Sequence, residues 1–176
     1  MTVFHKTLGL TSHGGTPSFL DITEQVRAAV AESGIANGIV AVMSPHTTCS
    51  IYYDEWVHDE YPDGTDYLQH DLGMVLEKII PAQQDFPPAD GYSYPGIKHF
   101  EAVEAWPSAP EYLPGGDRRN LLNADAHLKA SVIGSSSTFP VIDGALGFGV
   151  TGYIFFVDWD RARERSRKCQ LTIIGE

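Results

Sequence analysis

The feature that most constrains the fold of this chain is the uneven distribution of its prolines. Seven of the eleven prolines lie between residues 81 and 120, together with six aromatic residues. Proline interrupts regular backbone pairing, whereas aromatic side chains argue against simple disorder. We therefore predict an ordered excursion over about residues 81–120, packed on the domain or on a neighbouring subunit. Excursions of this length are more often functional than idle.

The segment before residue 65 predicts one helix and several strands. Residues 23–33 carry a helix signature, in which Thr23 can act as the N-terminal cap and Gly34 stands at the C-terminal cap position. The apolar run 39–43 predicts a buried strand. Residues 47–53 are rich in β-branched and aromatic residues, so we expect a second strand there.

A longer helix is predicted over residues 65–80, and Pro81 ends it. Its apolar positions follow helical spacing and form a stripe that we expect to pack inward, made of Leu68, Leu72, Val75, Leu76 and Ile79. Asp71 borders this stripe, where an unpaired carboxylate is costly. Asp71 is therefore a candidate functional residue, with a capping or buried hydrogen-bonding role as the alternative.

After the excursion the pattern predicts a helix and then strands. Asn123 is a candidate N-cap of the helix, and Gly134 ends it. Strands are predicted over residues 138–142 and 145–157, joined by Asp143-Gly144, which strongly favours a type I′ hairpin turn. Residues 168–174 are predicted to form the last strand. The mixture predicts an α+β domain, with helices covering one face of a largely antiparallel sheet.

Length, charge and composition limit the classes of protein to which the chain can belong. Its 176 residues suit a single domain spanning 1–176. A net charge of −11 argues against binding nucleic acid or anionic membranes. No apolar run reaches the roughly 20 residues of a transmembrane helix, and residues 2–10 alternate like a strand rather than a signal peptide. With only two cysteines, these features predict a cytoplasmic protein.

Two short segments carry most of the functional signal. Residues 44–48 read Ser-Pro-His-Thr-Thr, and residues 123–136 contain Asn123 and His127 one helical turn apart. Each segment places one histidine among small or hydroxylated residues. If the fold brings His46 and His127 together, they can hold a metal or move a proton near neutral pH.

Taken together, the motifs resemble the YjbQ-like family, whose members are often labelled secondary thiamine-phosphate synthases. The resemblance spans nearly the whole chain and rests on residues 44–48, 54–55, 71–72, 123–136 and 140–144. It implies a compact α+β domain that assembles as a homotrimer, with an active site near the subunit interfaces. It also implies an enzyme acting on a small phosphorylated or heterocyclic substrate.

By this resemblance the catalytic residues are His46, Asp71, Asn123 and His127, and His99 corresponds to a further family histidine. His46, His99 and His127 could together hold a divalent metal ion, for which zinc is the first candidate. The chain departs from the family in one strand, where Thr151 and Gly152 stand at the positions of a Trp-Gln pair. This departure and the long excursion predict an altered pocket.

A thiamine-phosphate-type reaction needs groups that bind anions. Candidates are the amides and hydroxyls of Gly134, Ser135 and Ser136, with Lys129 and the arginines at 165 and 167. We favour a simpler interpretation of the arginines at 161, 163, 165 and 167, as a solvated face at a subunit contact. Cys49 is expected to be a small buried hydrophobic residue rather than a nucleophile.

Two other functions compete with the enzyme hypothesis. One is a trimeric module that binds a small ligand or a metal without catalysis, which the missing Trp-Gln pair keeps open. The other is a metal-dependent hydrolase, in which a metal-bound water attacks the substrate.

Overall fold

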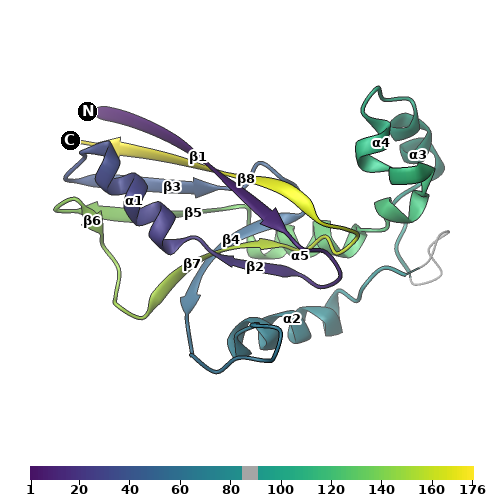
Figure 1. Ribbon diagram of the computed structural model, residues 1–176, viewed down its shortest axis with the longest axis horizontal. Helices are drawn as coiled ribbons and strands as arrows, with labels where there is room; N and C mark the ends of the chain where they lie inside the picture. The colour runs from purple at the N-terminus through teal and green to yellow at the C-terminus, as the bar shows by residue number, and fades with distance from the viewer. Residues whose placement is uncertain (85–90) are drawn as a thin grey trace.

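A computed structural model describes residues 1–84 and 91–176 and places two antiparallel sheets face to face (Figure 1). The larger sheet has the strand order β1-β8-β3-β5-β6, and the smaller has the order β2-β7-β4. The strands are β1 (Thr2–Ser12), β2 (Ser18–Asp21), β3 (Gly38–Met43), β4 (Cys49–Glu55), β5 (Ser136–Ile142), β6 (Ala145–Leu146), β7 (Gly152–Asp158) and β8 (Arg165–Gly175). The α+β prediction is confirmed, with the sheet split into two.

The main hydrophobic core fills the space between the two sheets. Helix α1 (Thr23–Ser33) inserts Val26 and Val30 into it. Strand β7 is buried on both faces, because Ile154 and Phe156 point into this core while Phe155 and Val157 join a second cluster. Helices α2 (Tyr67–Ile79) and α5 (Ala124–Ile133) supply side chains to that second cluster. Strand β7 therefore joins the two cores.

The predicted helix over residues 23–33 is confirmed, but its start is stabilised differently. Among the described residues the Thr23 hydroxyl accepts no N–H of the first helical turn, and the Asp21 carboxylate accepts the Thr23 backbone N–H at 2.8 Å. The Thr23 hydroxyl instead donates to Asp21 and accepts the Ile154 backbone N–H at 2.9 Å. Gly34 adopts the left-handed conformation (φ 66°) that ends many helices.

The hairpin turn at Asp143 and Gly144 is also confirmed. Both residues have positive φ (50° and 76°), as a type I′ turn requires. The strand predicted over residues 145–157 is wrong in its middle, because β6 ends at Leu146 and β7 begins only at Gly152. Similarly, the strand predicted from residue 47 begins at Cys49, because residues 47 and 48 form a turn.

Helix α2 forms close to the predicted bounds, but the prediction that its stripe packs inward is largely wrong. Leu76 is buried, whereas Val75 is 50% and Ile79 67% exposed in the single chain. Asp71 also faces outward: its side chain is 63% exposed, and its Oδ1 lies 3.4 Å from His70 Nδ1. The pattern identified the helix correctly, but not the surface that its stripe contacts.

The described part of the excursion forms short helices that project from one end of the sandwich (Figure 1). They are α3 (Ile97–Glu104), α4 (Ala109–Tyr112) and the 3-10 helices η1 (Pro114–Gly116) and η2 (Arg118–Leu121). A separate apolar cluster of Phe100, Val103, Leu113 and Leu121 holds them together. Residues 85–90, which belong to the predicted excursion, lie outside the described residues. Within the described ranges, no helix is both long and apolar enough to cross a membrane.

Candidate functional site

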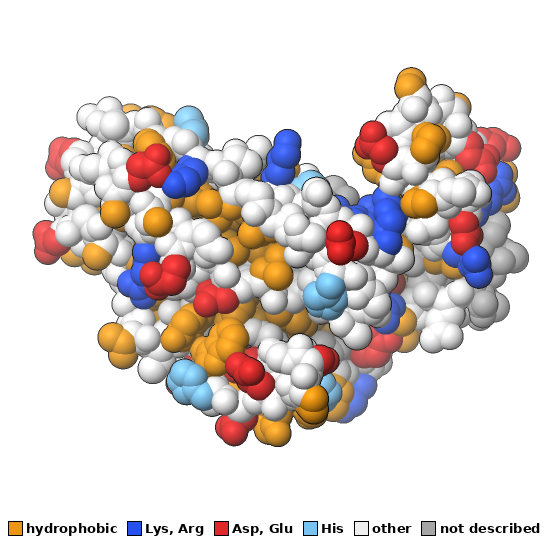
Figure 2. Space-filling model, viewed as in Figure 1, with side chains coloured by type: hydrophobic (Ala, Val, Ile, Leu, Met, Phe, Trp, Pro, Cys, Tyr) orange, Lys and Arg blue, Asp and Glu red, His pale blue; other side chains and the backbone are white. Residues whose placement is uncertain are grey.

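A pocket of about 600 Å³ lies where the excursion meets the end of the sandwich. Its walls come from the turn at residues 45–48, the start of α5, the segment 163–167 and the excursion helices. Figure 2 shows the notch between the body and the projecting helices, with Lys or Arg side chains at its edge. His46, His99, Asn123 and His127 all line the pocket. The structure thus brings together four of the predicted site residues.

His46 is held in one tautomer by the backbone of β8. Its Nε2 accepts the Lys168 backbone N–H at 2.9 Å, so a neutral ring carries its proton on Nδ1. Burial lowers the pKa of His46, Arg167 lowers it further, and Asp158 opposes the shift. His46 is therefore an uncharged donor at neutral pH.

His127 lies on α5 beside the aromatic residues of the excursion. Its ring and the Tyr94 ring meet edge to face, with the ring centroids 5.4 Å apart. Burial lowers the pKa of His127, while Asp160 and a hydrogen bond to the Thr47 backbone oppose the shift. The Tyr94 hydroxyl also lies 3.1 Å from His99 Nε2, so Tyr94 links the two histidines.

Two buried ion pairs form the wall below the histidines. Arg167 Nε donates to Asp158 at 2.6 Å, and its Nη2 donates to Asp158 at 3.0 Å. Arg165 Nη2 lies 2.8 Å from Asp160. Since the side chains of Arg165 and Arg167 are only 14% and 8% exposed, the prediction that they form a solvated face is wrong.

Two buried atoms of this wall have no hydrogen-bond partner among the described residues. They are Asn123 Oδ1, an acceptor, and Arg165 Nε, a donor. The other end of the Asn123 amide is fixed, because Nδ2 donates to Asp160 at 2.8 Å. Buried polar atoms are nearly always paired, so both atoms mark places where a ligand or water can bind.

Aromatic side chains from the excursion form the facing wall. Trp106 and Tyr112 meet edge to face at 5.4 Å, and both remain partly exposed. Arg163 donates to the backbone carbonyls of Glu111 and Tyr112, which ties this wall to the segment before β8. Tyr94, Trp106 and Asp160 were not among the predicted site residues. The alternation of Asp158, Asp160, Arg165 and Arg167 around one turn was the available signal.

Several predicted residues lie elsewhere. Lys129 does not reach the histidine pocket, because its side chain is buried against Asp125 and Glu77. Gly134 and Ser135 line a different hollow of about 460 Å³, which shares Pro45, His46 and Thr47 with the histidine pocket. Ser136 begins β5, and Asp71 lies on the exposed face of α2.

The three-histidine metal set does not fit the side chains as they lie. A histidine that binds a metal through one nitrogen carries its proton on the other, whereas His46 Nε2 already accepts a backbone N–H. Across residues 1–84 and 91–176, no group of three or more His, Cys, Asp or Glu side chains is arranged to hold a metal ion. The metal therefore stays a prediction.

The positions of the missing Trp-Gln pair lie away from the pocket. Gly152 pairs with Glu55 in the smaller sheet, and a Cβ placed on it would overlap the Tyr53 hydroxyl. Tyr53 in turn packs against Phe148 and Phe139, with ring centroids 5.0 Å and 5.8 Å apart. Within one chain, this departure changes the packing of Tyr53 rather than the histidine pocket.

Comparison with known proteins identifies relatives along almost the whole chain. A family model described as "UPF0047 protein YjbQ-like" matches residues 7–176. A UPF0047 protein of Archaeoglobus fulgidus is 31% identical over 146 residues, covering 83% of this chain and 84% of the relative. One from Methanothermobacter thermautotrophicus is 28% identical over 157 residues, covering 89% and 82%.

A solved structure has a similar fold. It is a protein from Clostridium acetobutylicum, described as an uncharacterized conserved protein of the YjbQ/UPF0047 family. The two have a TM-score of 0.64 at 27% identity, covering 95% of this chain and 99% of the other. The chain therefore belongs to the YjbQ-like family of UPF0047 proteins.

Proposed function

We propose that this protein is an enzyme that binds a small phosphorylated heterocyclic substrate in the histidine pocket. The observation that carries the proposal is the pairing of two different walls around one cavity. Trp106 and Tyr112 offer apolar ring surfaces, while Arg163, Arg165 and His46 offer hydrogen-bond donors. Such a pocket suits a flat ring that carries a phosphate group.

The proposed reaction is of the thiamine-phosphate-synthase type. A ring nitrogen of one substrate attacks the methylene carbon of the other, and the carbon–oxygen bond to pyrophosphate breaks. Pyrophosphate leaves with the electron pair of that bond. The Nε–H of Arg165 has no partner among the described residues and can donate to the leaving group, as can the Nδ1–H of His46.

His127 and Asn123 complete the proposed site. His127 is uncharged at neutral pH and close to Tyr94, so it can accept a proton from a bound substrate or orient its ring. The Oδ1 of Asn123, which none of the described side chains or backbone groups binds, can accept a hydrogen bond from an amino group. Asp71 could contribute only from another subunit, since it lies outside the pocket of its own chain.

We also propose that the protein is a cytoplasmic homotrimer, as the family resemblance implies. Exposed apolar side chains on α2 and α5 support an assembly, because monomers rarely leave such surfaces open. They are Leu68, Val75, Ile79, Leu128 and Val132. Multi-angle light scattering on the purified protein measures the subunit number, and a monomeric mass would contradict this proposal.

The function is tested by measuring pyrophosphate release from thiazole phosphate and pyrimidine diphosphate. We expect His127→Ala to abolish turnover. Arg163→Ala should raise KM about tenfold, because the pocket loses an anion donor and the contact that holds the carbonyls of Glu111 and Tyr112 in place. His5→Ala is the matched control, because His5 lies on β1 away from the pocket.

The same variants distinguish the competing functions. If the wild type releases no more pyrophosphate than His127→Ala, but calorimetry shows that inorganic pyrophosphate binds, the chain is a binding module. Hydrolysis that is lost with a chelator and restored by zinc would instead favour the metal-dependent hydrolase.

A further inference from the structure

We propose that the chain has a second small-molecule site, which takes an uncharged planar heteroaromatic compound with carbonyl acceptors. The site is a cavity of about 600 Å³ between β2, the loop at 57–66 and α2. Lys129, Trp159 and Arg161 also line it, and none of its lining residues lines the histidine pocket. Lys129 and His127 point to opposite sides of α5, because residues two apart on a helix are separated by about 200°.

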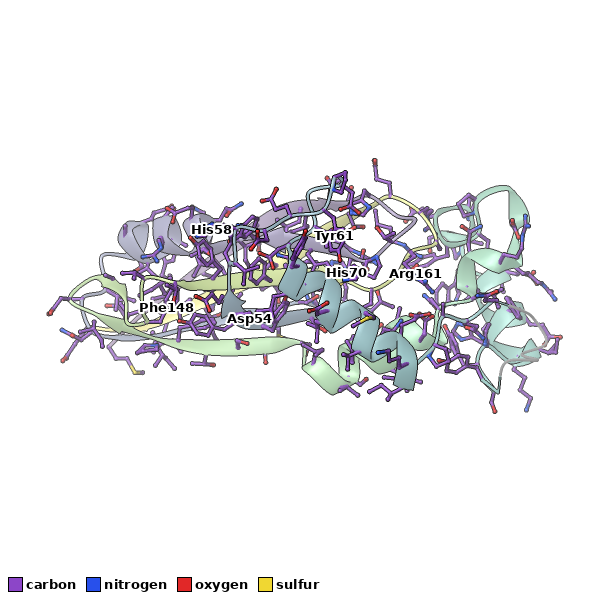
Figure 3. The ribbon with its side chains drawn as sticks, turned by 90° about the horizontal axis from the view of Figure 1, so that it is seen from below. Asp54, His58, Tyr61, His70, Phe148 and Arg161 are labelled. Atoms are coloured by element: carbon purple, nitrogen blue, oxygen red, sulfur yellow. The ribbon has the colours of Figure 1, made fainter. Side chains whose placement is uncertain are left out.

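The walls of this second cavity are rich in aromatic rings. Phe19 and Trp159 meet edge to face at 5.6 Å, and Tyr61 lies 4.4 Å from His70 between ring centroids. Figure 3 shows Tyr61, His70 and Arg161 beside one another along α2. A flat ring can pack against these surfaces and displace poorly bound water.

The polar end of the cavity is already balanced in charge. Lys129 Nζ lies 2.8 Å from Glu77 Oε2 and 3.1 Å from Asp125 Oδ2, which also accepts Arg161 Nη2 at 3.1 Å. Two cations therefore face two carboxylates at this end, so a charged group on a ligand would find no unpaired opposite charge among these four side chains.

Hydrogen-bond donors nevertheless remain at this end. An ammonium group has three N–H donors, and the described residues give Lys129 two acceptors. The third donor can bind a carbonyl oxygen of an uncharged ligand. This is the reason for assigning an acceptor-bearing but neutral compound to the cavity.

Gly73 keeps the wall of the cavity open. It lies inside α2, where glycine costs about 1 kcal/mol relative to alanine. A Cβ placed on it would meet no heavy atom within 4 Å. The helix thus carries a destabilising residue at a place where packing does not demand one, beside an empty space that a ligand can use.

The test uses lumichrome, an uncharged planar heterocycle with two carbonyl groups, titrated into the purified protein and followed by its fluorescence. We expect saturable binding at one site per chain. Gly73→Leu should weaken binding at least about tenfold, because the leucine side chain fills the cavity. The helix should stay folded in this variant, since leucine is a better helix former than glycine. Lys78→Leu is the matched control on the same helix, since Lys78 is exposed, does not line the cavity and is not among the apolar side chains of the proposed assembly surface.

Three further measurements decide the outcome. His127→Ala should leave lumichrome binding unchanged, and 2-naphthoate, a planar anion, should bind more weakly than lumichrome. No saturable binding, equal binding to Gly73→Leu, or loss of binding in His127→Ala would overturn the proposal. A changed subunit number in Gly73→Leu would also overturn it, because the cavity would then belong to a subunit contact.

Discussion

Asn123 and Asp160 join the start of α5 to the turn after β7, through a hydrogen bond of 2.8 Å from Nδ2 to Oδ2. Asp160 is 2% exposed and also pairs with Arg165 at 2.8 Å. One buried carboxylate therefore orients an amide and a guanidinium that both line the histidine pocket. Asn123 Oδ1 and Arg165 Nε, which have no hydrogen-bond partner within the described part of the chain, owe their positions to this shared carboxylate.

Replacing Asn123 tests this arrangement. Asn123→Ala should lower the free energy of unfolding by about 1–3 kcal/mol, because Asp160 loses a buried hydrogen bond. Asn123→Asp should cost more at pH 8 than at pH 5, since protonation relieves the repulsion between two buried carboxyl groups. Urea unfolding at both pH values measures this difference. Asn120→Ala is the control, because it removes a part-buried hydrogen bond of 3.0 Å to the Asp117 carbonyl. If Asn123→Asp lowers the free energy of unfolding equally at both pH values, the prediction is contradicted.

Arg167→Met should destabilise the protein strongly. Asp158 is fully buried, so losing its partner leaves an uncompensated carboxylate at a cost of about 3–5 kcal/mol. Adding Asp158→Asn should recover much of the loss, because an amide carries no charge. Thermal unfolding of the wild type and the three variants measures the coupling, and additive effects would contradict it.

The same ion pair predicts a loss of stability in acid. Burial raises the pKa of Asp158, but the hydrogen bonds and charge of Arg167 outweigh this and lower it overall. The carboxylate therefore stabilises the fold above its ordinary pKa of about 3.9, and this contribution is lost as the pH falls through the lower folded value. Urea midpoints measured below pH 4 should fall more steeply in the wild type than in the Arg167→Met/Asp158→Asn variant.

The two pocket histidines predict a separate effect at higher pH. Burial lowers the pKa of both His46 and His127, so the unfolded chain binds protons first as the pH falls below about 6.5. Stability should therefore decrease from pH 7 to pH 5. His46→Gln keeps an acceptor for the Lys168 N–H but does not titrate, so its urea midpoints should fall less over this range. A slope equal to that of the wild type would contradict the prediction.

Local signals in the sequence predicted which helices and turns form better than they predicted which elements pack against one another. The helix over residues 23–33 and the Asp143-Gly144 turn follow from nearby residues alone, and both form as expected. The stripe of α2 identified a helix, but periodicity does not specify the packing partner, and Val75 and Ile79 remain exposed in the single chain. The break between β6 and β7 was missed because residues 147–151 contain no proline and no charge, although Gly147 and Gly149 stand in it.

The candidate site shows the same limit. His46, His99, Asn123 and His127 were expected and line one pocket, whereas Lys129 was expected there and pairs with Asp125 instead. From the sequence alone an arginine is predicted to be exposed to solvent, unless a carboxylate that can pair with it in a buried position is known. For Arg165 and Arg167 the partners are Asp160 and Asp158 across one turn, and only the alternation of acidic and basic residues around that turn indicates the pairing.

The lack of a side chain at Gly152 leaves room for the Tyr53 ring. Gly152→Ala should lower the free energy of unfolding by about 1–3 kcal/mol, because the new Cβ displaces the Tyr53 ring from Phe148. In a Tyr53→Ala background the same change should cost much less, since the obstructing ring is gone. Tyr53→Phe is the matched control: it removes the hydroxyl but keeps ring atoms that also overlap the Cβ, so the cost should persist. Urea unfolding of the double-mutant cycle measures the coupling, and additive costs would show that Tyr53 does not occupy the space beside Gly152.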